Sequence, residues 1–263
     1  MTKMIVVKIG GNVLDDHESL SLFLNDFASI QQPKILIHGG GKTASRIGEQ
    51  LKIKPNFING RRITDIDTLN LVSMVYAGLI NKQLVARLQQ LSCNAIGLTG
   101  ADGNLIKATK RQNKEIDFGF VGDIYDSSVN SDLLHLLISQ KLVPVFAALT
   151  HGNGTMLNTN ADTIASTLAI AMSKYFELRL IFCFDKKGVL LDVEDPQSQI
   201  HNLNESDYRK LLTSEKLHDG ILPKLENAFL SLNKGIKEII IGEAKDLLVN
   251  ITNQPTGTWI KKY

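Results

Sequence analysis

Two stretches of the chain place glycines and a lysine directly after a short apolar run. Residues Ile35–Lys42 read ILIHGGGK and lead into a helical pattern, and residues Met4–Asn12 read MIVVKIGGN. A strand that enters a helix through glycines points several backbone N–H groups and the positive end of a helix at one spot, which suits a phosphate group. We therefore expect the two glycine turns to face each other across a phosphoryl group.

Four charged side chains, one of them in the first glycine stretch, could take part in the same chemistry. Taken singly, Lys8 and Arg62 could be surface cations at turns, and Lys224 a lysine of a first helical turn. Asp162 could simply favour the positive end of its helix. Together they supply cations and one acid beside the glycine N–H donors, with no nucleophile, metal cluster or catalytic triad. Phosphoryl transfer needs that inventory, because it depends on charge stabilisation and in-line positioning.

Other motif families are excluded by their spacing. Gly41-Lys42-Thr43 resembles the end of a Walker A loop, but the first glycine of that loop would fall at Leu36, inside the strand. Neither glycine turn reads G-x-G-x-x-G, and no acidic residue ends the second strand, which argues against a dinucleotide-binding fold. The sequence also lacks an H-R-D catalytic loop and a G-x-S-x-G elbow.

Composition is that of an ordinary globular protein. Of the 263 residues 43% are hydrophobic, and 29 basic against 27 acidic residues give a net charge of +2, too balanced to indicate a nucleic-acid partner. No apolar stretch approaches the roughly 18 residues of a membrane span, and no signal-peptide pattern is present. Cys93 and Cys183 lie in apolar runs without C-x-x-C or zinc spacing. We therefore expect buried, reduced thiols and a cytoplasmic protein.

Short apolar strands alternate with helical patterns along the chain. The expected strands are Met4–Ile9, Ile35–His38, Ala95–Leu98, Leu142–Ala147, Leu178–Phe184, Ile239–Ile241 and Gly257–Ile260. The expected helices are Asp16–Ile30, Thr43–Leu51, Asp65–Leu91, Ser131–Gln140, Thr163–Met172, Glu205–Leu212, Leu222–Asn233 and Ala244–Val249. Between them we expect a hairpin over Ile53–Thr64, irregular β structure over Leu105–Ile124 and a loop at His151–Gly154.

Strands that are apolar without alternation indicate a mostly parallel sheet covered on both faces, so the fold class is α/β, a three-layer αβα sandwich. In such sheets ligands bind at the carboxyl ends of the strands. The chain places segments rich in glycine, lysine or Asx residues at these ends: Lys8–Gly11, His38–Lys42, Thr99–Gly103, Asn158–Asp162 and Asp185–Gly188.

Five motifs in this order resemble those of the N-acetylglutamate kinases, which belong to the amino-acid kinase fold family. They are Lys8–Gly11, His38–Gly41, Asn59–Thr64, Asn158–Asp162 and Asp219–Lys224. The glycines and the lysine alone would indicate only the fold family, whereas the N-G-x-R-x-T and N-x-N-A-D motifs narrow the resemblance to this branch. The resemblance extends to Gly257–Ile260 and so covers nearly the whole chain.

The resemblance implies transfer of the γ-phosphoryl group of ATP to the side-chain carboxylate of N-acetyl-L-glutamate, in arginine biosynthesis. It also implies an N-terminal lobe, residues 1–173, that binds the acyl amino acid, and a C-terminal lobe, residues 174–263, that binds ATP on the same sheet. Mg²⁺ would be held by the ATP phosphates and not by protein ligands. The acceptor carboxylate is already ionised at pH 7, so no general base is needed.

Residue roles follow from the matching motif positions. Lys8 and Lys224 would stabilise the transferring phosphoryl group, Asp162 would hold both ammonium groups, and Gly11 would donate its backbone N–H. The substrate-binding residues would be Gly40, Gly41, Arg62 and Asn158. The ATP-binding residues would be Gly10, which would also offer its N–H, and Asp185, Lys186, Lys187, Gly188, Val189, Leu190, Lys216, Leu217 and His218.

The sequence leaves several alternatives open. Phe184 stands where the family usually has a small hydroxyl residue, which weakens the assignment of the nucleotide loop. Lys42 and Arg61 could be surface residues, or they could meet an N-succinyl group with its additional carboxylate. Another carboxylate kinase of this fold, for example one acting on an aminoadipate derivative, and a non-catalytic ligand sensor are further alternatives. Members of the family that arginine inhibits are hexamers with an extra N-terminal helix. This sequence does not contain that helix, so we expect a homodimer that arginine does not inhibit.

Overall fold

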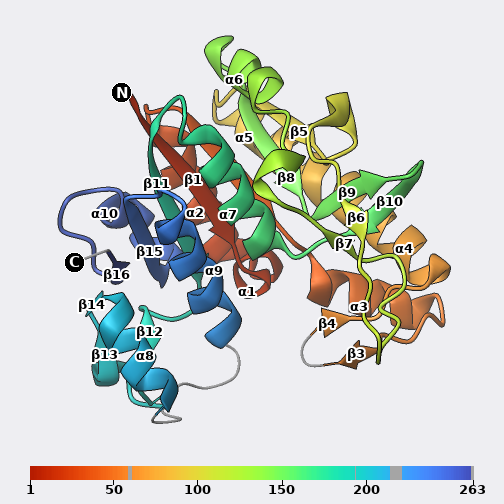
Figure 1. Ribbon diagram of the computed structural model, residues 1–263. Helices are drawn as coiled ribbons and strands as arrows, with labels where there is room; N and C mark the ends of the chain where they lie inside the picture. The colour runs from red at the N-terminus through yellow and green to blue at the C-terminus, as the bar shows by residue number, and fades with distance from the viewer. Residues whose placement is uncertain (59–60, 193, 214–220, 262–263) are drawn as a thin grey trace.

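The computed structural model describes residues 1–58, 61–192, 194–213 and 221–261, which contain one main sheet (Figure 1). In spatial order its strands are β14 (Asn202–Leu203), β16 (Thr258–Ile260), β15 (Glu238–Glu243), β11 (Glu177–Phe184), β1 (Lys3–Ile9), β2 (Lys34–His38), β8 (Val143–Ala147) and β5 (Ala95–Leu98). Strands from residues 1–173 lie on one side of the β1–β11 pairing and strands from residues 174–263 on the other. The division into two lobes stays a prediction.

The sheet is parallel from β15 to β5, which confirms what the unbroken apolar strands predict. The direction changes at the other edge, where β16 runs antiparallel to β15 and β14 runs parallel to β16. The parallel part of the sheet therefore brings the carboxyl ends of β1, β2 and β11 to a single edge.

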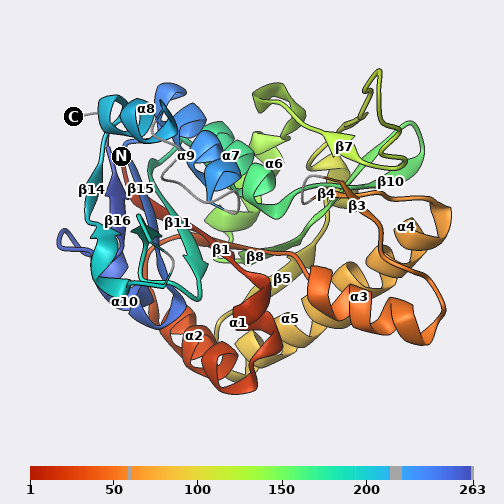
Figure 2. The ribbon, with the colours of Figure 1, turned by 90° about the horizontal axis from the view of Figure 1, so that it is seen from below.

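Helices cover both faces of the sheet, so the expected three-layer arrangement is confirmed (Figure 2). One face is covered by α6 (Ser131–Ser139), α7 (Ala161–Met172), α8 (Glu205–Thr213) and α9 (Leu222–Asn233). The other is covered by α1 (Gly11–Asp15), α2 (His17–Ser29), α5 (Asn81–Gln90) and α10 (Leu247–Asn250). Next to α1 lies α3 (Gly41–Gln50), which in turn contacts α4 (Ile66–Val72). Short 3₁₀ helices are Asp102–Asn104, Asp126–Ser128, Pro196–Ser198 and Ala244–Asp246.

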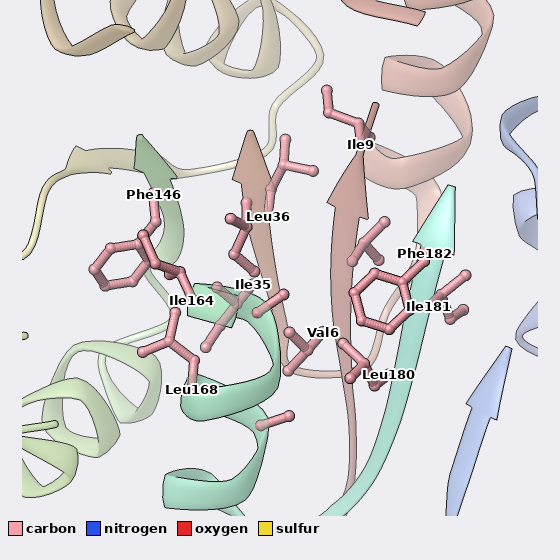
Figure 3. Close-up of a cluster of buried hydrophobic side chains, with 14 of the residues drawn as sticks. Val6, Ile9, Ile35, Leu36, Phe146, Ile164, Leu168, Leu180, Ile181 and Phe182 are labelled. Carbon is pink, nitrogen blue, oxygen red and sulfur yellow. The ribbon is translucent and has the colours of Figure 1, made fainter. Parts of the chain in front are cut away.

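The core lies between α7 and the central strands (Figure 3). Val6 of β1, Ile35 of β2 and Leu180 of β11 are neighbours in the strand register and are fully buried. Ile164 and Leu168 of α7 pack over this face and are also fully buried. Because side chains alternate along a strand, the face of β1 that carries Val6 also carries Lys8, which is thereby directed at the start of α7.

Small two-stranded sheets surround the carboxyl edge. They are β3 (Phe57–Ile58) with β4 (Arg61–Arg62), β6 (Thr109–Lys110) with β7 (Gly122–Asp123), β9 (Leu149–Gly152) with β10 (Thr155–Asn158), and β12 (Val189–Leu190) with β13 (Gln199–Ile200). The β3–β4 pair confirms the hairpin expected before Thr64, although its Asn59-Gly60 turn lies outside the described residues.

Two expectations about local structure were wrong or incomplete. The segment His151–Gly154 is not a loop, because Gly152 pairs with Thr155 and the turn contains only Asn153 and Gly154. Both turn residues have positive φ, 50° and 75°, which matches the tight hairpin turn that an Asn-Gly pair favours. The expected helix over Asp65–Leu91 is continuous, but residues Ser73–Ile80 in its middle are π-helical.

The described residues contain no helix that is long and apolar enough to cross a membrane. Cys93 and Cys183 are free and buried, as their apolar surroundings predict. Burial raises the pKa of the Cys183 thiol to about 12, so this thiol remains protonated at neutral pH.

Candidate active site

The register of β1 against β2 brings the two glycine turns together. Ile9 pairs with His38, so the residues that follow each of them leave the sheet side by side. The helices that begin there, α1 and α3, lie next to each other (Figure 2). Thr43 Oγ1 of α3 donates a hydrogen bond to Asp15 Oδ1 of α1 at 2.6 Å. The two turns are therefore adjacent, as expected, and a phosphoryl group between them stays a prediction.

Gly40 has a backbone conformation and surroundings that exclude other residues. Its φ is +154°, and a Cβ at this position would approach Cδ1 of Tyr76 to 2.9 Å and overlap the side chain of Ile80. Gly40 is the N-cap of α3 and provides no side-chain cap for the helix. Within the described residues, no acceptor binds the backbone N–H of Gly40, Gly41 or Gly11. These amides can therefore serve a ligand.

Gly10 needs a correction. The family resemblance implies that Gly10 binds ATP and offers its backbone N–H, but this N–H donates to the carbonyl oxygen of Cys183 at 2.8 Å. That bond extends the β1–β11 ladder by one residue beyond the paired positions Ile9 and Cys183. The Gly10 amide is therefore already satisfied within the sheet, and the first N–H group of this turn without an acceptor in the described part of the chain belongs to Gly11.

Lys8 and Asp162 form an ion pair at the centre of the site. The distance from Lys8 Nζ to Asp162 Oδ1 is 2.7 Å, and the two side chains are 12% and 11% exposed. Asp162 lies in the first turn of α7, where Asn160 caps the helix by accepting hydrogen bonds from the N–H groups of Asp162 and Thr163. This cap fixes the start of α7 and with it the backbone position of Asp162.

The charges around Asp162 outweigh its desolvation. Burial alone would raise the pKa of this carboxyl group, but the ammonium groups of Lys8 and Lys224 keep its pKa below the ordinary value. Lys224 belongs to the first turn of α9, and burial together with the nearby charge of Lys8 lowers the pKa of its ammonium group, while Asp162 and Asp185 act in the opposite sense. The electrostatic influence of Asp162 therefore reaches both lysines.

Phe184 lies beside Lys224. The Nζ atom of Lys224 is 6.0 Å from the centroid of the Phe184 ring, at the end of β11. An aromatic face attracts a cation, so this residue adds to the electrostatic surroundings of the lysine where a hydroxyl group would have offered a hydrogen bond. The unusual residue before Asp185 therefore has a physical role in this chain.

The predicted substrate-side residues converge on the start of α3. Arg62 is buried, and its Nη2 donates to the carbonyl oxygen of Gly41 at 2.9 Å and to Ser45 Oγ at 2.8 Å. Its guanidinium group also lies 4.6 Å from the ring centroid of Phe57. Arg62 thus joins the hairpin β3–β4 to α3.

Asn158 reaches the same region from the end of β10. Its Nδ2 donates to Thr64 Oγ1 at 3.0 Å, and Thr64 Oγ1 in turn donates to the carbonyl oxygen of Arg62 at 3.3 Å. Thr64 therefore connects the two residues that the sequence assigns to one ligand. Thr64 is the last residue of the motif Asn59–Thr64, but the motif alone does not indicate that it connects Asn158 to Arg62.

On the predicted nucleotide side, Asp185, Lys186 and Lys187 are exposed after β11. Gly188 is buried, and Val189 and Leu190 are buried in β12. Lys216, Leu217 and His218 lie outside the described residues, as do Asp219 and Gly220. Their assignment to a nucleotide pocket stays a prediction.

Asn12 is a residue whose part sequence reasoning missed. Its Nδ2 donates to Asp185 Oδ2 at 2.6 Å, and its Oδ1 accepts a hydrogen bond from Lys42 Nζ. It therefore links the start of α3 to the end of β11 across the first glycine turn. Its position directly after Gly10 and Gly11 was the one feature of the sequence that could have indicated this contact. Lys42 is engaged in this chain of contacts, whereas Arg61 is exposed.

Among the described residues no group of three or more His, Cys, Asp or Glu side chains could hold a metal ion. The site instead combines cations, one buried carboxylate and a set of backbone N–H groups. Such an arrangement stabilises negative charge that moves or accumulates. Its chemistry is that of positioning and charge stabilisation.

Comparison with known proteins agrees with this chemistry. Residues 3–242 match the amino acid kinase family. The chain is 49% identical over 261 residues to an acetylglutamate kinase from Cytophaga hutchinsonii, covering 98% of each chain, and 47% identical over 263 residues to one from Bacteroides fragilis, covering 99% of this chain and 97% of that one. A solved structure from Streptococcus mutans is 25% identical, with a TM-score of 0.81 and 99% of each chain covered.

Replacing Asp162 tests the electrostatic account. In Asp162→Asn two lysines lose their common counter-ion, and we expect the free energy of unfolding at pH 7 to fall by roughly 3–5 kcal/mol. Since the folded pKa of Asp162 is lowered, its stabilising contribution is complete above the unfolded value of 3.8 and is lost as pH falls through the lower folded pKa. Urea denaturation of both proteins at several pH values measures this difference.

Asp132→Asn is the matched control, because Asp132 forms an ion pair with Lys174 at 3.0 Å but is 81% exposed. Its substitution should leave the unfolding midpoint nearly unchanged. Equal midpoints for Asp162→Asn and the wild type at pH 7 would contradict the account.

Proposed function

The chain belongs to the amino acid kinase family, and from this premise we propose that it phosphorylates the side-chain carboxylate of N-acetyl-L-glutamate with ATP, in arginine biosynthesis. The observation that carries the proposal is the buried Asp162 between Lys8 and Lys224, beside two glycine turns. The product is an acyl phosphate. The high identity to acetylglutamate kinases over nearly the whole chain supports the choice of substrate.

The reaction is an in-line displacement. A carboxylate oxygen of the substrate attacks the γ-phosphorus of ATP, and the bond between that phosphorus and the bridging oxygen of the β-phosphate breaks to release ADP. No proton needs to move, because the carboxylate is already ionised. The main barrier arises from repulsion between the carboxylate and the triphosphate, and cations and N–H donors held in place reduce this repulsion.

Each proposed cation or N–H donor stabilises the negative charge at a different place along the line from the acceptor carboxylate to the triphosphate. Lys8 is placed to meet the phosphoryl group from the acceptor side and Lys224 from the nucleotide side. Asp162 forms an ion pair with Lys8, and its charge counteracts the lowering of the Lys224 pKa that burial causes. The N–H groups of Gly11, Gly40 and Gly41 supply hydrogen bonds without adding mobile side chains.

ATP use follows from membership of a kinase family, and we propose Mg²⁺ as the second cofactor. When bound with ATP, the ion would neutralise part of the phosphate charge. Asp162 is engaged by Lys8, and the described residues contain no cluster of three metal-binding side chains. Both observations favour an ion held mainly by the phosphates.

We propose that Arg62 and Asn158 bind the α-carboxylate of the amino acid. Nη2 of Arg62 contacts Gly41 and Ser45, and the guanidinium group also interacts with the Tyr76 hydroxyl, so a carboxylate would meet the donors that remain. Those contacts also pre-orient the guanidinium group, so that little side-chain entropy is lost when the substrate binds.

A second candidate substrate is N-succinyl-L-glutamate, which carries one more carboxylate. A hollow of about 460 Å³ opens beside Gly41, and its lining includes Lys42 and Arg46. These two cations suit an acyl group that ends in a negative charge, although Glu49 also lines the hollow. Measuring kcat/KM with N-acetyl-L-glutamate and with N-succinyl-L-glutamate decides between the two acyl groups.

We also propose that the enzyme is a cytoplasmic homodimer. The free, buried cysteines Cys93 and Cys183 agree with a reducing compartment. Exposed apolar side chains at Ile66, Met74 and Leu79, all on the helical run 66–90, offer a surface for a second copy.

An activity assay over a panel of acceptors tests the proposed function. Hydroxamate formation or coupled ADP release should be greatest with N-acetyl-L-glutamate and lower with glutamate and N-acetyl-aminoadipate. A higher kcat/KM with N-succinyl-L-glutamate would assign the second candidate. Inactivity with every N-acylglutamate would reject the proposed acylglutamate kinase function.

Removing either lysine should slow the chemical step. For Lys8→Ala and for Lys224→Ala we expect kcat to fall by roughly 10²–10³, because each removes one preorganised group that stabilises transferring charge. Steady-state kinetics measure the effect, and Lys174→Ala provides a control because Lys174 is exposed in a pair with Asp132. A kcat near that of the wild type in either variant would exclude the assigned role.

Loss of Arg62 should affect binding of the amino acid more than the chemical step. For Arg62→Ala we expect KM for the acyl amino acid to rise roughly 10- to 100-fold, since a charge-assisted carboxylate contact is lost. KM for ATP should change little. An unchanged KM for the amino acid, with intact ATP affinity, would contradict this role.

A further inference from the structure

A buried histidine lies directly beneath the second glycine turn. His38 is the last residue of β2 and has no exposed surface. Its Nδ1 is 2.8 Å from the carbonyl oxygen of Gly39, and its Nε2 is 3.1 Å from Nδ2 of Asn81. Neither His38 nor Asn81 has a role in the function proposed above. Both nevertheless have buried polar side chains, and burying a polar side chain is costly unless its hydrogen bonds are satisfied.

The hydrogen bonds fix the state of the ring. Burial lowers the pKa of His38 to about 4, so the imidazole is neutral at pH 7 and has one N–H and one lone pair. The carbonyl oxygen of Gly39 can only accept, so Nδ1 carries the hydrogen and Nε2 accepts. Asn81 Nδ2 supplies the hydrogen for Nε2 and also donates to the carbonyl oxygen of Val145 at 2.8 Å. Every donor in the network meets an acceptor.

This network sets the orientation of the peptide bond between Gly39 and Gly40. In a trans peptide the C=O and the following N–H point in opposite directions. With the Gly39 oxygen held toward the His38 ring, the Gly40 N–H must point away from the ring. Gly40 is buried, and none of the described residues accepts a hydrogen bond from this N–H. This N–H is therefore available to an acceptor atom of a ligand.

The π-helical segment supplies the partner of His38. The N–H of Asn81 donates to the carbonyl oxygen of Tyr76, five residues earlier. This wider turn lets Tyr76 and Ile80 pack on Gly40 while the adjacent Asn81 reaches His38. In β5, Gly97 provides the space, because a Cβ there would overlap Oδ1 of Asn81. π-helical turns are uncommon and concentrate at functional sites.

We propose that His38, held by Asn81, is a positioning residue that aims the backbone N–H of Gly40 at the phosphoryl group during its transfer. The proposal rests on the kinase function proposed above. It predicts that losing the hydrogen-bond donor at Nδ1 of His38 lowers kcat. Losing Asn81 should lower kcat only because the His38 ring is then no longer held in its orientation.

Two substitutions of His38 separate these contacts. His38→Asn places an amide N–H near the position of Nδ1 and loses the contact with Asn81, whereas His38→Gln reaches toward Asn81 and loses the donor to Gly39. We expect His38→Asn to retain most of kcat and His38→Gln to lose roughly 10²-fold, the cost of a misplaced catalytic group. KM for ATP should change little in both, because the Gly40 N–H acts in the transition state.

Asn81→Leu provides an independent measurement if His38→Gln does not fold. It should lower kcat in the wild-type background and have no additional effect in the His38→Asn background, where the contact is already lost. His135→Gln, on α6 and remote from the glycine turns, should behave as the wild type. Thermal midpoints recorded alongside show whether a variant is merely unfolded.

The outcomes distinguish the two proposals. An active wild type with equal kcat losses in His38→Asn and His38→Gln, or with no loss in either, would overturn the positioning role and leave the kinase function intact. A wild type that phosphorylates no N-acylglutamate would remove the kinase function, and the positioning role with it.

Discussion

The buried carboxylate of Asp162 is the interaction on which the site depends. Two ammonium groups in a partly dry space repel each other, and burial favours their neutral forms. Asp162 opposes both effects, since it forms an ion pair with Lys8 and acts to raise the pKa of Lys224. The pair is costly to bury in isolation, so its presence at a sheet edge surrounded by N–H donors is better explained by function than by stability.

The parallel register of the sheet is what places these charges. Lys8 is on the face of β1 that packs against α7, and the cap at Asn160 places Asp162 opposite it. The same register sets the two glycine turns side by side, because Ile9 pairs with His38. Charge, hydrogen-bond donors and helix starts therefore meet without any long loop. A rigid sheet supplies the precision that positioning chemistry requires.

Much of the fold could be predicted because its signals are local. Unbroken apolar strands such as Leu178–Phe184 indicate a buried parallel sheet, and the helices that cover it have regular apolar faces. The π-helical segment at Ser73–Ile80 could not be predicted, because its residues are apolar nearly all round and no sequence pattern separates a π-helical turn from an α-helical one. The hairpin turn at Asn153-Gly154 had a recognisable signal in the Asn-Gly pair, and there the prediction was wrong although the information was present.

The sequence by itself determined the types of chemistry available: lysines, one acid and glycine turns, in an order that resembles a known family of kinases. Only the tertiary structure decided which of these groups are free to act. The Gly10 amide is taken up by Cys183 because the β1–β11 ladder extends one residue past the strand, and Asn12 contacts both Lys42 and Asp185 across the turn. Such pairings depend on register and distance between segments far apart in the chain, and local sequence patterns carry no information about them.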